Sequence, residues 1–149
     1  MPKSIFLLFS HKLTSEQIDQ LKEKGIERFF YLPDALQKIW SNVPAEGIVL
    51  SEYLKPLIGW LSENSQEGDF VLIQGDFGAT FYMVDFCFDV GLIPVYATTK
   101  RSVREKIVDG SIVKISEFKH VEFRKYERWK KWTWQLFWLA IRQYLMWFI

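Results

Sequence analysis

The chain has 149 residues, enough for one domain with a sizeable core, and its 49% hydrophobic and 25% charged residues are ordinary for a globular protein. The net charge of +1 divides unevenly, because residues 1–123 carry −4 and residues 124–149 carry +5. A mildly acidic body argues against a binder of duplex DNA, although a local basic cluster could still hold a small anion. The single cysteine, Cys87, excludes an internal disulfide and lies in an apolar stretch where burial is expected.

In chain order, apolar runs that suit buried strands alternate with helix patterns as far as residue 97. Strands are predicted over residues 4–9, 27–32, 70–73 and 93–97. Helices are predicted between Thr14 and Gly25, from Pro33 through Trp40, from residue 51 or 52 to about Asn64, and from Thr80 to Val90. The first helix carries a capping box, because Thr14 stands three residues before Gln17. Residues 41–51 are expected to form a loop, with a brief extended piece at 48–50.

This alternation predicts an α/β fold with a mostly parallel, doubly wound sheet. In such folds the binding site lies in the crevice at the carboxyl ends of the strands. Three polar groups follow strands in this way, at Ser10–His11, Gln74–Thr80 and Thr98–Arg101, and their convergence is the main physical argument for a site. The short start before the first strand lacks the length and cleavage region of a signal peptide, so we expect a cytoplasmic protein.

The central feature is the turn between the third strand and the helix that follows it, with the sequence Gln-Gly-Asp-Phe-Gly-Ala-Thr over residues 74–80. Gly75 and Gly78 permit unusual backbone conformations, and Asp76 or Thr80 can supply oxygens near a helix start. Such a turn aims backbone N–H groups and the positive end of a helix dipole at one point, which suits a phosphate. Equally, two glycines and an aspartate can simply make a tight connection, since no complete dinucleotide fingerprint or P-loop is present.

Beyond Arg101 the pattern changes to that of a β-hairpin. Residues 103–108 and 111–115 flank Asp109-Gly110, a pair that suits a type I′ turn, and residues 121–123 could add another strand. Such a ribbon could extend the sheet, cover the ligand crevice or reach a second subunit. Pro94 in the preceding strand favours a strand start and argues against a place in the middle of the sheet.

Gly-Asp-Phe-Gly-Ala-Thr at residues 75–80 and Ala-Thr-Thr-Lys-Arg at residues 97–101 are more specific together than either is alone, and four stretches in all carry a resemblance to a known family. They are Ile-Phe-Leu-Leu-Phe-Ser-His-Lys-Leu-Thr at residues 5–14, Tyr-Leu-Pro at 31–33 with Trp40 downstream, Gln-Gly-Asp-Phe-Gly-Ala-Thr at 74–80 and Pro-Val-Tyr-Ala-Thr-Thr-Lys-Arg at 94–101. Over roughly residues 1–123 the chain thereby resembles small CRISPR-associated accessory proteins of type III systems, the group numbered twenty in the Csx series. The resemblance implies a Rossmann-like fold, a homodimer or higher homo-oligomer, and recognition of cyclic oligoadenylate second messengers. It implies either a ring nuclease that opens cyclic tetra-adenylate or a non-catalytic module that sequesters it.

Opening such a ring requires no protein nucleophile, because the ribose 2′-hydroxyl can attack the adjacent phosphate. On the resemblance, the catalytic candidates are His11, as acid or base, with Lys100 and Arg101, which would stabilise charge on the phosphoryl oxygens. The ligand-binding candidates are Ser10, Gln74, Gly75, Asp76, Phe77, Gly78, Ala79, Thr80, Thr98 and Thr99. No spacing of His, Cys and carboxylates matches a zinc site, and neither a metal nor a cofactor is expected.

Several of these residues also have a simpler interpretation. His11 could be a surface residue at a helix entry, and Lys100 with Arg101 could be a solvated pair that opens the hairpin. His120, in the expected ribbon, is more readily a structural or surface residue than a catalytic one. Two aspartates four residues apart, at positions 85 and 89, are expected on the solvent face of their helix.

Residues 124–149 form a second region that holds five of the seven tryptophans, and its last 18 residues contain a single charge, Arg142. We expect a Trp-rich helix whose broad apolar face packs on the body or on the same helix of another subunit. Alternatively, residues 127–149 contact a membrane and tether a sensor there, although Arg142 and Gln143 count against a simple span. Disorder is the remaining alternative.

Overall fold

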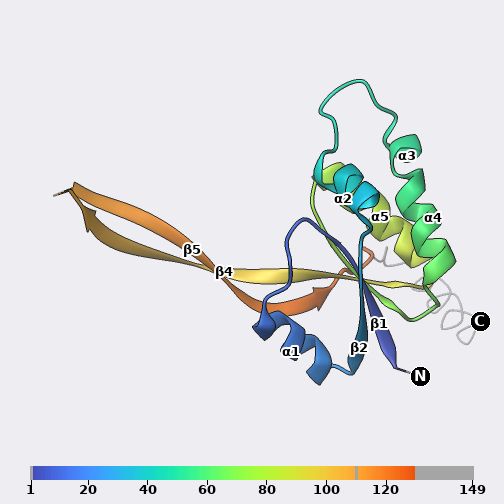
Figure 1. Ribbon diagram of the computed structural model, residues 1–149, viewed down its shortest axis with the longest axis horizontal. Helices are drawn as coiled ribbons and strands as arrows, with labels where there is room; N and C mark the ends of the chain where they lie inside the picture. Colours follow the sequence, from blue (N-terminus) through green and yellow to red (C-terminus); the bar gives the residue numbers. More distant parts are fainter. Residues whose placement is uncertain (1, 110, 130–149) are drawn as a thin grey trace, which may run out of the picture.

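The computed structural model describes residues 2–109 and 111–129, which form a five-stranded sheet with helices on both of its faces (Figure 1). The strands are β1 (Lys3–Phe9), β2 (Ile26–Tyr31), β3 (Phe70–Gln74), β4 (Ile93–Val108) and β5 (Ser111–Lys125). The helices are α1 (Ser15–Glu23), α2 (Asp34–Ser41), α3 (Leu50–Tyr53), α4 (Lys55–Asn64) and α5 (Phe77–Asp89). The expected α/β class is confirmed at this level.

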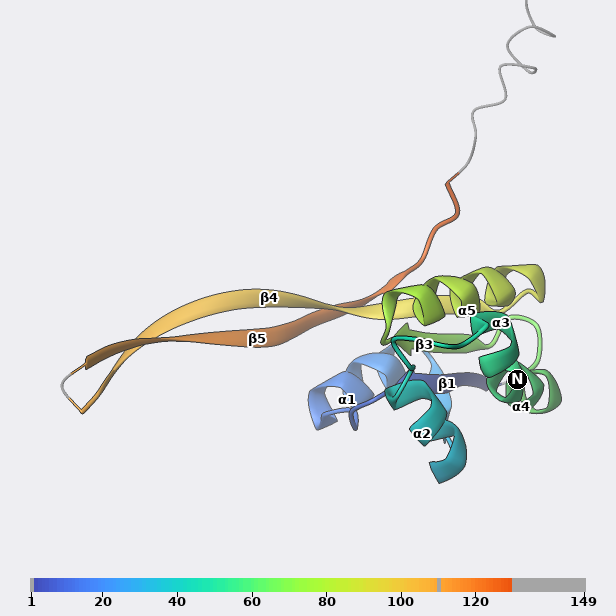
Figure 2. The ribbon, with the colours of Figure 1, turned by 90° about the horizontal axis from the view of Figure 1, so that it is seen from above.

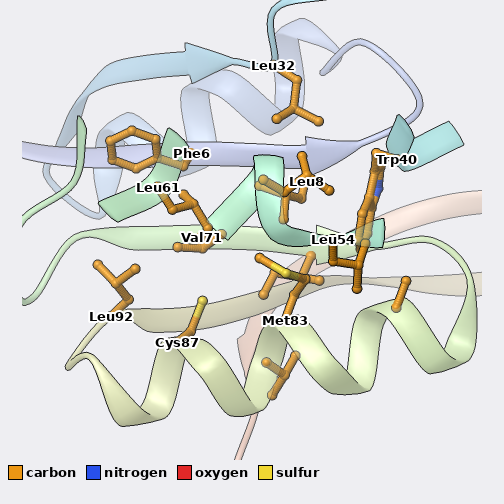
Figure 3. Close-up of a cluster of buried hydrophobic side chains, with 14 residues drawn as sticks. Phe6, Leu8, Leu32, Trp40, Leu54, Leu61, Val71, Met83, Cys87 and Leu92 are labelled. Atoms are coloured by element: carbon orange, nitrogen blue, oxygen red, sulfur yellow. The ribbon is translucent and has the colours of Figure 1, made fainter. Parts of the chain in front are cut away.

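The strand order is β2-β1-β3-β4-β5, and every pairing is parallel except that between β4 and β5. Successive side chains of a strand point to opposite faces, so each buried strand contributes to two cores. Phe6 and Leu8 of β1 join the core under α2–α5, whereas Ile5 and Leu7 join the core under α1. Figure 3 shows the larger core, with Phe6, Leu8 and Trp40 on one side and the buried face of α5 on the other.

The helices lie in the regions that the sequence predicts, but some of their boundaries differ. The capping box before α1 is confirmed, because the Thr14 side chain accepts from Gln17 N and the Gln17 side chain accepts from Thr14 N. The helix expected over 51–64 is divided at Leu54, where α3 ends and α4 begins with a proline in its first turn. Helix α5 begins at Phe77 instead of Thr80, because the Asp76 side chain caps it one turn earlier.

The hairpin is longer than the sequence indicated. The expected separate pieces are two continuous strands, β4 and β5, which pair with each other from Val95 and Lys125 out to Val108 and Ser111. Their inner ends extend the sheet, and their outer ends project from the body as a two-stranded ribbon (Figure 2). Asp109 has a φ of 49°, as a type I′ turn requires, while Gly110 lies outside the described residues.

The expectation against a mid-sheet place for Pro94 is wrong. Strand β4 lies between β3 and β5, and Pro94 is its second residue, opposite Val71 of β3. The Pro94 carbonyl still accepts a hydrogen bond, from Tyr126 N at 3.0 Å, just beyond the end of β5. Proline is tolerated there because it lies close to the strand start.

The Trp-rich helix was expected over residues 124–149, and its start is corrected: residues 124 and 125 pair with β4 as the end of β5, and residues 126–129 are not helical. The rest of the expected helix, residues 130–149, lies outside the described part of the chain, and so does most of the segment considered for membrane contact. Among the helices of residues 2–109 and 111–129, none has the length and apolar character needed to cross a bilayer.

Candidate functional site

The carboxyl ends of β1 and β3 meet at one edge of the sheet, and β4 continues past this edge into the ribbon. Phe9 and Gln74 are opposite each other in the parallel pair β1–β3, which brings Ser10 and Gly75 to the same edge. Regular pairing of β3 with β4 ends at Val95, and the Gln74 side chain continues it by accepting from Ala97 N at 3.2 Å. The polar groups after β1 and β3 are therefore brought together with the start of the Thr98–Arg101 group, which lies within β4 and does not follow it.

Helix α2 closes one side of this edge through two contacts that sequence reasoning did not assign. Trp40 Nε1 donates to the Gln74 carbonyl at 3.3 Å, and Ser41 Oγ donates to Ser10 Oγ at 3.2 Å. Gly75 is needed here for space, because a Cβ on it would lie 2.9 Å from Trp40 Cζ2. A sequence signal existed for Trp40, which follows Pro33 at the spacing of a buried helix face, but no local pattern marks Ser41.

The turn after β3 presents the N-terminus of α5. Asp76 Oδ1 accepts from Ala79 N at 2.9 Å, so the Ala79 amide is already satisfied, and the Ala79 side chain is fully buried. The amides of Phe77 and Gly78 occupy the first two helical positions and have no partner within the helix. Phe77 is 94% exposed, so the residue at this helix end also carries an accessible aromatic ring. This end of α5 thus offers two N–H donors and a flat apolar surface to a ligand.

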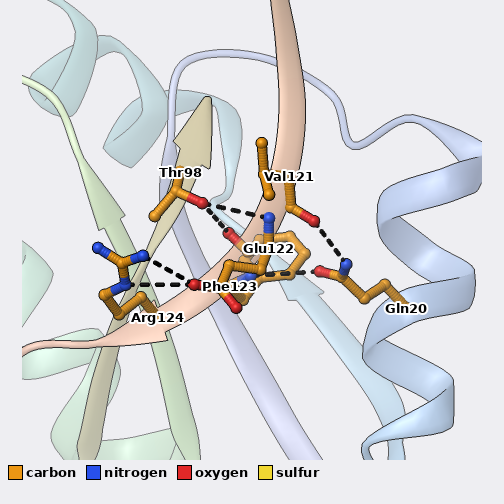
Figure 4. Close-up of polar contacts among 6 residues, drawn as sticks. All are labelled: Gln20, Thr98, Val121, Glu122, Phe123 and Arg124. Carbon is orange, nitrogen blue, oxygen red and sulfur yellow. Dashed lines mark hydrogen bonds and ion pairs between the residues drawn. The ribbon is translucent and has the colours of Figure 1, made fainter. Parts of the chain in front are cut away.

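Thr80 and Thr98 have local surroundings that differ from the expected contacts. Thr80 Oγ1 is buried and has no hydrogen-bond partner among the described residues. Thr98 Oγ1 donates to the Glu122 carbonyl at 3.1 Å and accepts from Glu122 N at 3.2 Å, which bridges the irregular register between β4 and β5 (Figure 4). The Thr98 hydroxyl therefore already has two partners within the ribbon.

Lys100 and Arg101 belong to the ribbon and lie on opposite faces of it, because successive side chains of a strand alternate. The Arg101 guanidinium donates to Ser116 Oγ from Nε at 3.2 Å and from Nη2 at 2.9 Å, and it lies 5.9 Å from the Phe118 ring centroid. Thr99, next to Lys100, is exposed. Within one chain, Lys100 and Arg101 do not act together on one phosphate.

Lys100 instead faces Lys119, which is directly opposite it on β5. Both side chains are exposed, and no ion pair to either lysine occurs within the described part of the chain. Two like charges directly across a ribbon repel each other, and an anion between them would relieve that repulsion. Lys119 was missed, although counting back from the Asp109-Gly110 turn gives this register from the sequence alone.

The two histidines have different surroundings. His11 is exposed, and its ring contacts Phe9 edge-on at a centroid distance of 5.3 Å. His120 lies away from the sheet edge, where its Nε2 is 3.1 Å from Gln20 Oε1 of α1. Burial lowers the pKa of His120 below its usual value, and the nearby Glu16 opposes that shift. The expected structural role of His120 fits these contacts.

Among residues 2–109 and 111–129, no group of three or more His, Cys, Asp or Glu side chains is arranged to hold a metal ion. Cys87 is fully buried on the inner face of α5, and burial raises the pKa of its thiol to about 12. The site therefore consists of backbone amides, hydroxyls, an exposed phenylalanine and lysines, a set that suits a phosphate-bearing aromatic ligand.

Comparison with known proteins finds a family model and a relative that match most of the chain. The sequence model described as "Uncharacterized protein MJ1673 family" matches residues 3–124. A relative from Methanocaldococcus jannaschii, named "Uncharacterized protein MJ1673", is 51% identical over 127 residues, which cover 85% of this chain and 98% of the relative. No solved structure matches the chain. The matched region of the family model contains β1–β5 almost entire and ends before the tryptophan-rich segment.

Proposed function

The chain belongs to the MJ1673 family, and we propose that it binds cyclic tetra-adenylate, a second messenger of type III CRISPR defence, at the carboxyl edge of its sheet. The observation that carries this proposal is the Lys100–Lys119 pair, two exposed lysines directly opposite each other on the ribbon that continues β4 beyond this edge. The strand order β2-β1-β3-β4, with helices on both faces, supports a Rossmann-like assignment of the fold. The resemblance of residues 1–123 to Csx-series proteins supplies the ligand.

Each part of the ligand has a matching group on this edge or on the ribbon that continues from it. A phosphate would lie between Lys100 and Lys119, and a second would accept from the amides of Phe77 and Gly78. An adenine ring would stack on the exposed Phe77 side chain, a contact that serves any base because every base has a flat face. Four identical nucleotides in a ring suit a symmetrical homodimer that offers the same edge twice.

We propose that the bound ring is opened. The ribose 2′-oxygen attacks the adjacent phosphorus, the bond to the 5′-oxygen breaks, and the products end in a 2′,3′-cyclic phosphate and a 5′-hydroxyl. One proton leaves the 2′-hydroxyl and one is added to the 5′-oxygen, so the step is balanced without another reactant. His11 at the end of β1 is the residue that would move these protons, and Lys100 and Lys119 would stabilise charge on the phosphoryl oxygens.

Sequestration without cleavage is the second candidate, and the surroundings of His11 favour it. A catalytic base is normally held in place by a partner, whereas the contact found for the His11 ring is the edge of Phe9. A binding module needs the lysines and the amides but not His11. In either case we place the protein in the cytoplasm, where the messenger would be bound.

The binding proposal is tested by lysine substitution with a matched control on the same ribbon. Lys100→Ala and Lys119→Ala should each weaken binding of cyclic tetra-adenylate by about 10- to 100-fold, the value of a lost charged hydrogen bond, and more strongly at low salt. Lys114→Ala is the control, because Lys114 lies in the outer half of the ribbon, 3.9 Å from Glu105. Arg101→Ala should have less effect than Lys100→Ala. Unchanged affinity in both lysine variants would remove the proposed phosphate site.

A further inference from the structure

Helix α5 has an unfilled groove along its outer side. The groove encloses about 330 Å³ between α5 and residues 126–129, and its walls include Phe77, Thr80, Phe81, Phe88, Tyr126 and Trp129. Phe81 is 76% exposed and Trp129 is 83% exposed, although both are large apolar side chains. A groove with such walls is expected to be covered in the folded protein.

The sequence of α5 supports this expectation. Its inner face buries Ala79, Met83 and Cys87 against the sheet, so the helix already has one apolar face in the core. Phe77 and Phe81 add apolar surface on a second side. A helix that is apolar on more than one side is normally buried on more than one side. Within the described part of the chain, no segment covers this second apolar side of α5.

Residues 126–129 lead the chain into this groove and are fixed to its walls. Tyr126 Oη donates to the Ile73 carbonyl at 3.0 Å, which holds the tyrosine over the end of β3. Arg128 forms ion pairs with Asp85 and Asp89, and its guanidinium lies 5.1 Å from the Phe88 ring centroid. The two aspartates lie on the exposed face of α5, as the sequence predicts, and there they pair with Arg128.

We propose that residues 130–149 of the same chain cover the groove. They directly follow Trp129, which is itself part of the groove wall, so no linker has to be crossed. Twenty residues in helical form would span about 30 Å, against about 20 Å for the 13 residues of α5. Residues 132–149 contain a single charge, so their composition matches the apolar walls. The groove shares Phe77 with the proposed base contact, and the test below therefore uses Phe81, which takes no part in that contact.

Residues 130–149 lie outside the part of the chain that matches the family. The family model ends at residue 124, and the match to the relative from Methanocaldococcus jannaschii takes up 98% of that protein. The family match therefore contains the α/β body and leaves out residues 125–149. A chain that ends at Trp129 is accordingly a reasonable test variant.

The test uses a cysteine introduced at position 81 to measure whether the groove is covered. The thiol of the Phe81→Cys variant should react with a maleimide at least about tenfold more slowly in the full chain than in a chain ending at Trp129, because cover must open before reaction. Val103→Cys is the matched control: Val103 lies on the projecting ribbon, is 54% exposed, and should react equally fast in both chains. Cys87 should not contribute, since its thiol is buried and its pKa is about 12.

Two further measurements show what covers the groove. If the thiol at position 81 is protected from the maleimide equally at micromolar and nanomolar protein concentrations, the same chain covers the groove. If this protection is lost on dilution, the proposal is overturned in favour of a second copy of the chain. Protection that needs vesicles of phosphatidylcholine and phosphatidylglycerol overturns it in favour of a membrane. Should the shortened chain not fold, a full-length Phe81→Cys chain that also carries Trp138→Asp replaces it, and an equally slow reaction of the introduced thiol in that chain also overturns the proposal.

Discussion

Replacing Gly75 with alanine should destabilise the protein, because Gly75 lies against the ring of Trp40. A Cβ on residue 75 would lie 2.9 Å from Trp40 Cζ2, 3.0 Å from Cε2 and 3.1 Å from Nε1. The ring cannot move easily, since Trp40 is 1% exposed in the larger core and its Nε1 donates to the Gln74 carbonyl. The substitution therefore forces overpacking in a region that is already full.

The expected magnitude follows from these two contacts. Overpacking typically costs about 1–3 kcal/mol, and partial loss of the Trp40–Gln74 hydrogen bond adds up to about 1 kcal/mol. We expect the Gly75→Ala variant to lose about 2 kcal/mol in free energy of unfolding. For a chain of this length, that loss lowers the melting temperature by about 4–8 °C.

Gly59→Ala is the matched control. Gly59 lies inside α4, and nothing is within 4 Å of the Cβ position, so alanine should stabilise the helix by about 0.5–1 kcal/mol. Urea and thermal unfolding followed by far-ultraviolet circular dichroism measure both variants. A Gly75→Ala variant as stable as the parent would refute the close approach of Trp40 to the turn, and with it the packing of α2 against the edge of the site.

Three further predictions concern the described side chains. The Cys87 thiol, with its pKa raised to about 12 by burial, should resist alkylation by iodoacetamide at pH 8 and react once urea unfolds the chain; rapid reaction in the native protein would contradict its burial. Asp76→Ala should reduce the free energy of unfolding by about 1 kcal/mol through loss of the α5 cap, measured by urea unfolding. His120 has a lowered pKa in the folded state, so the unfolded chain takes up its proton first and stability should fall as the pH drops below about 6.5. The His120→Gln variant should lose less stability over the same pH range than the parent, and equal losses would assign the pH dependence to other groups.

Much of the fold follows from local patterns in the sequence. The strand and helix periods, the Thr14 capping box and the Asp-Gly turn each predict an element that the structure contains. The boundaries that sequence reasoning placed differently depend on single side chains or on tertiary pairing. Helix α5 begins early because of one Asp76 hydrogen bond, and β4 continues past Ala97 because β5 pairs with it along its whole length.

The site was predictable in outline and less so in detail. Strand order and polar residues after each strand predict the edge where Ser10 and Gln74 meet. Strand alternation places Lys100 and Arg101 on opposite faces of the ribbon, and the hairpin register pairs Lys100 with Lys119. Both features could have been predicted from the sequence if the hairpin had been extended back from the Asp-Gly turn to residue 100. The approach of Ser41 to Ser10 depends on how α2 packs, and no pattern near either serine indicates it.

The most direct test of the proposed function is incubation of the purified full chain with cyclic tetra-adenylate in excess EDTA, followed by chromatographic separation of ring and products. We predict a protein–ligand complex, and linear products that end in a 2′,3′-cyclic phosphate. Intact ring that elutes with the protein would leave the binding site in place and assign sequestration as its role. No association of the ring with the protein would contradict the proposed function.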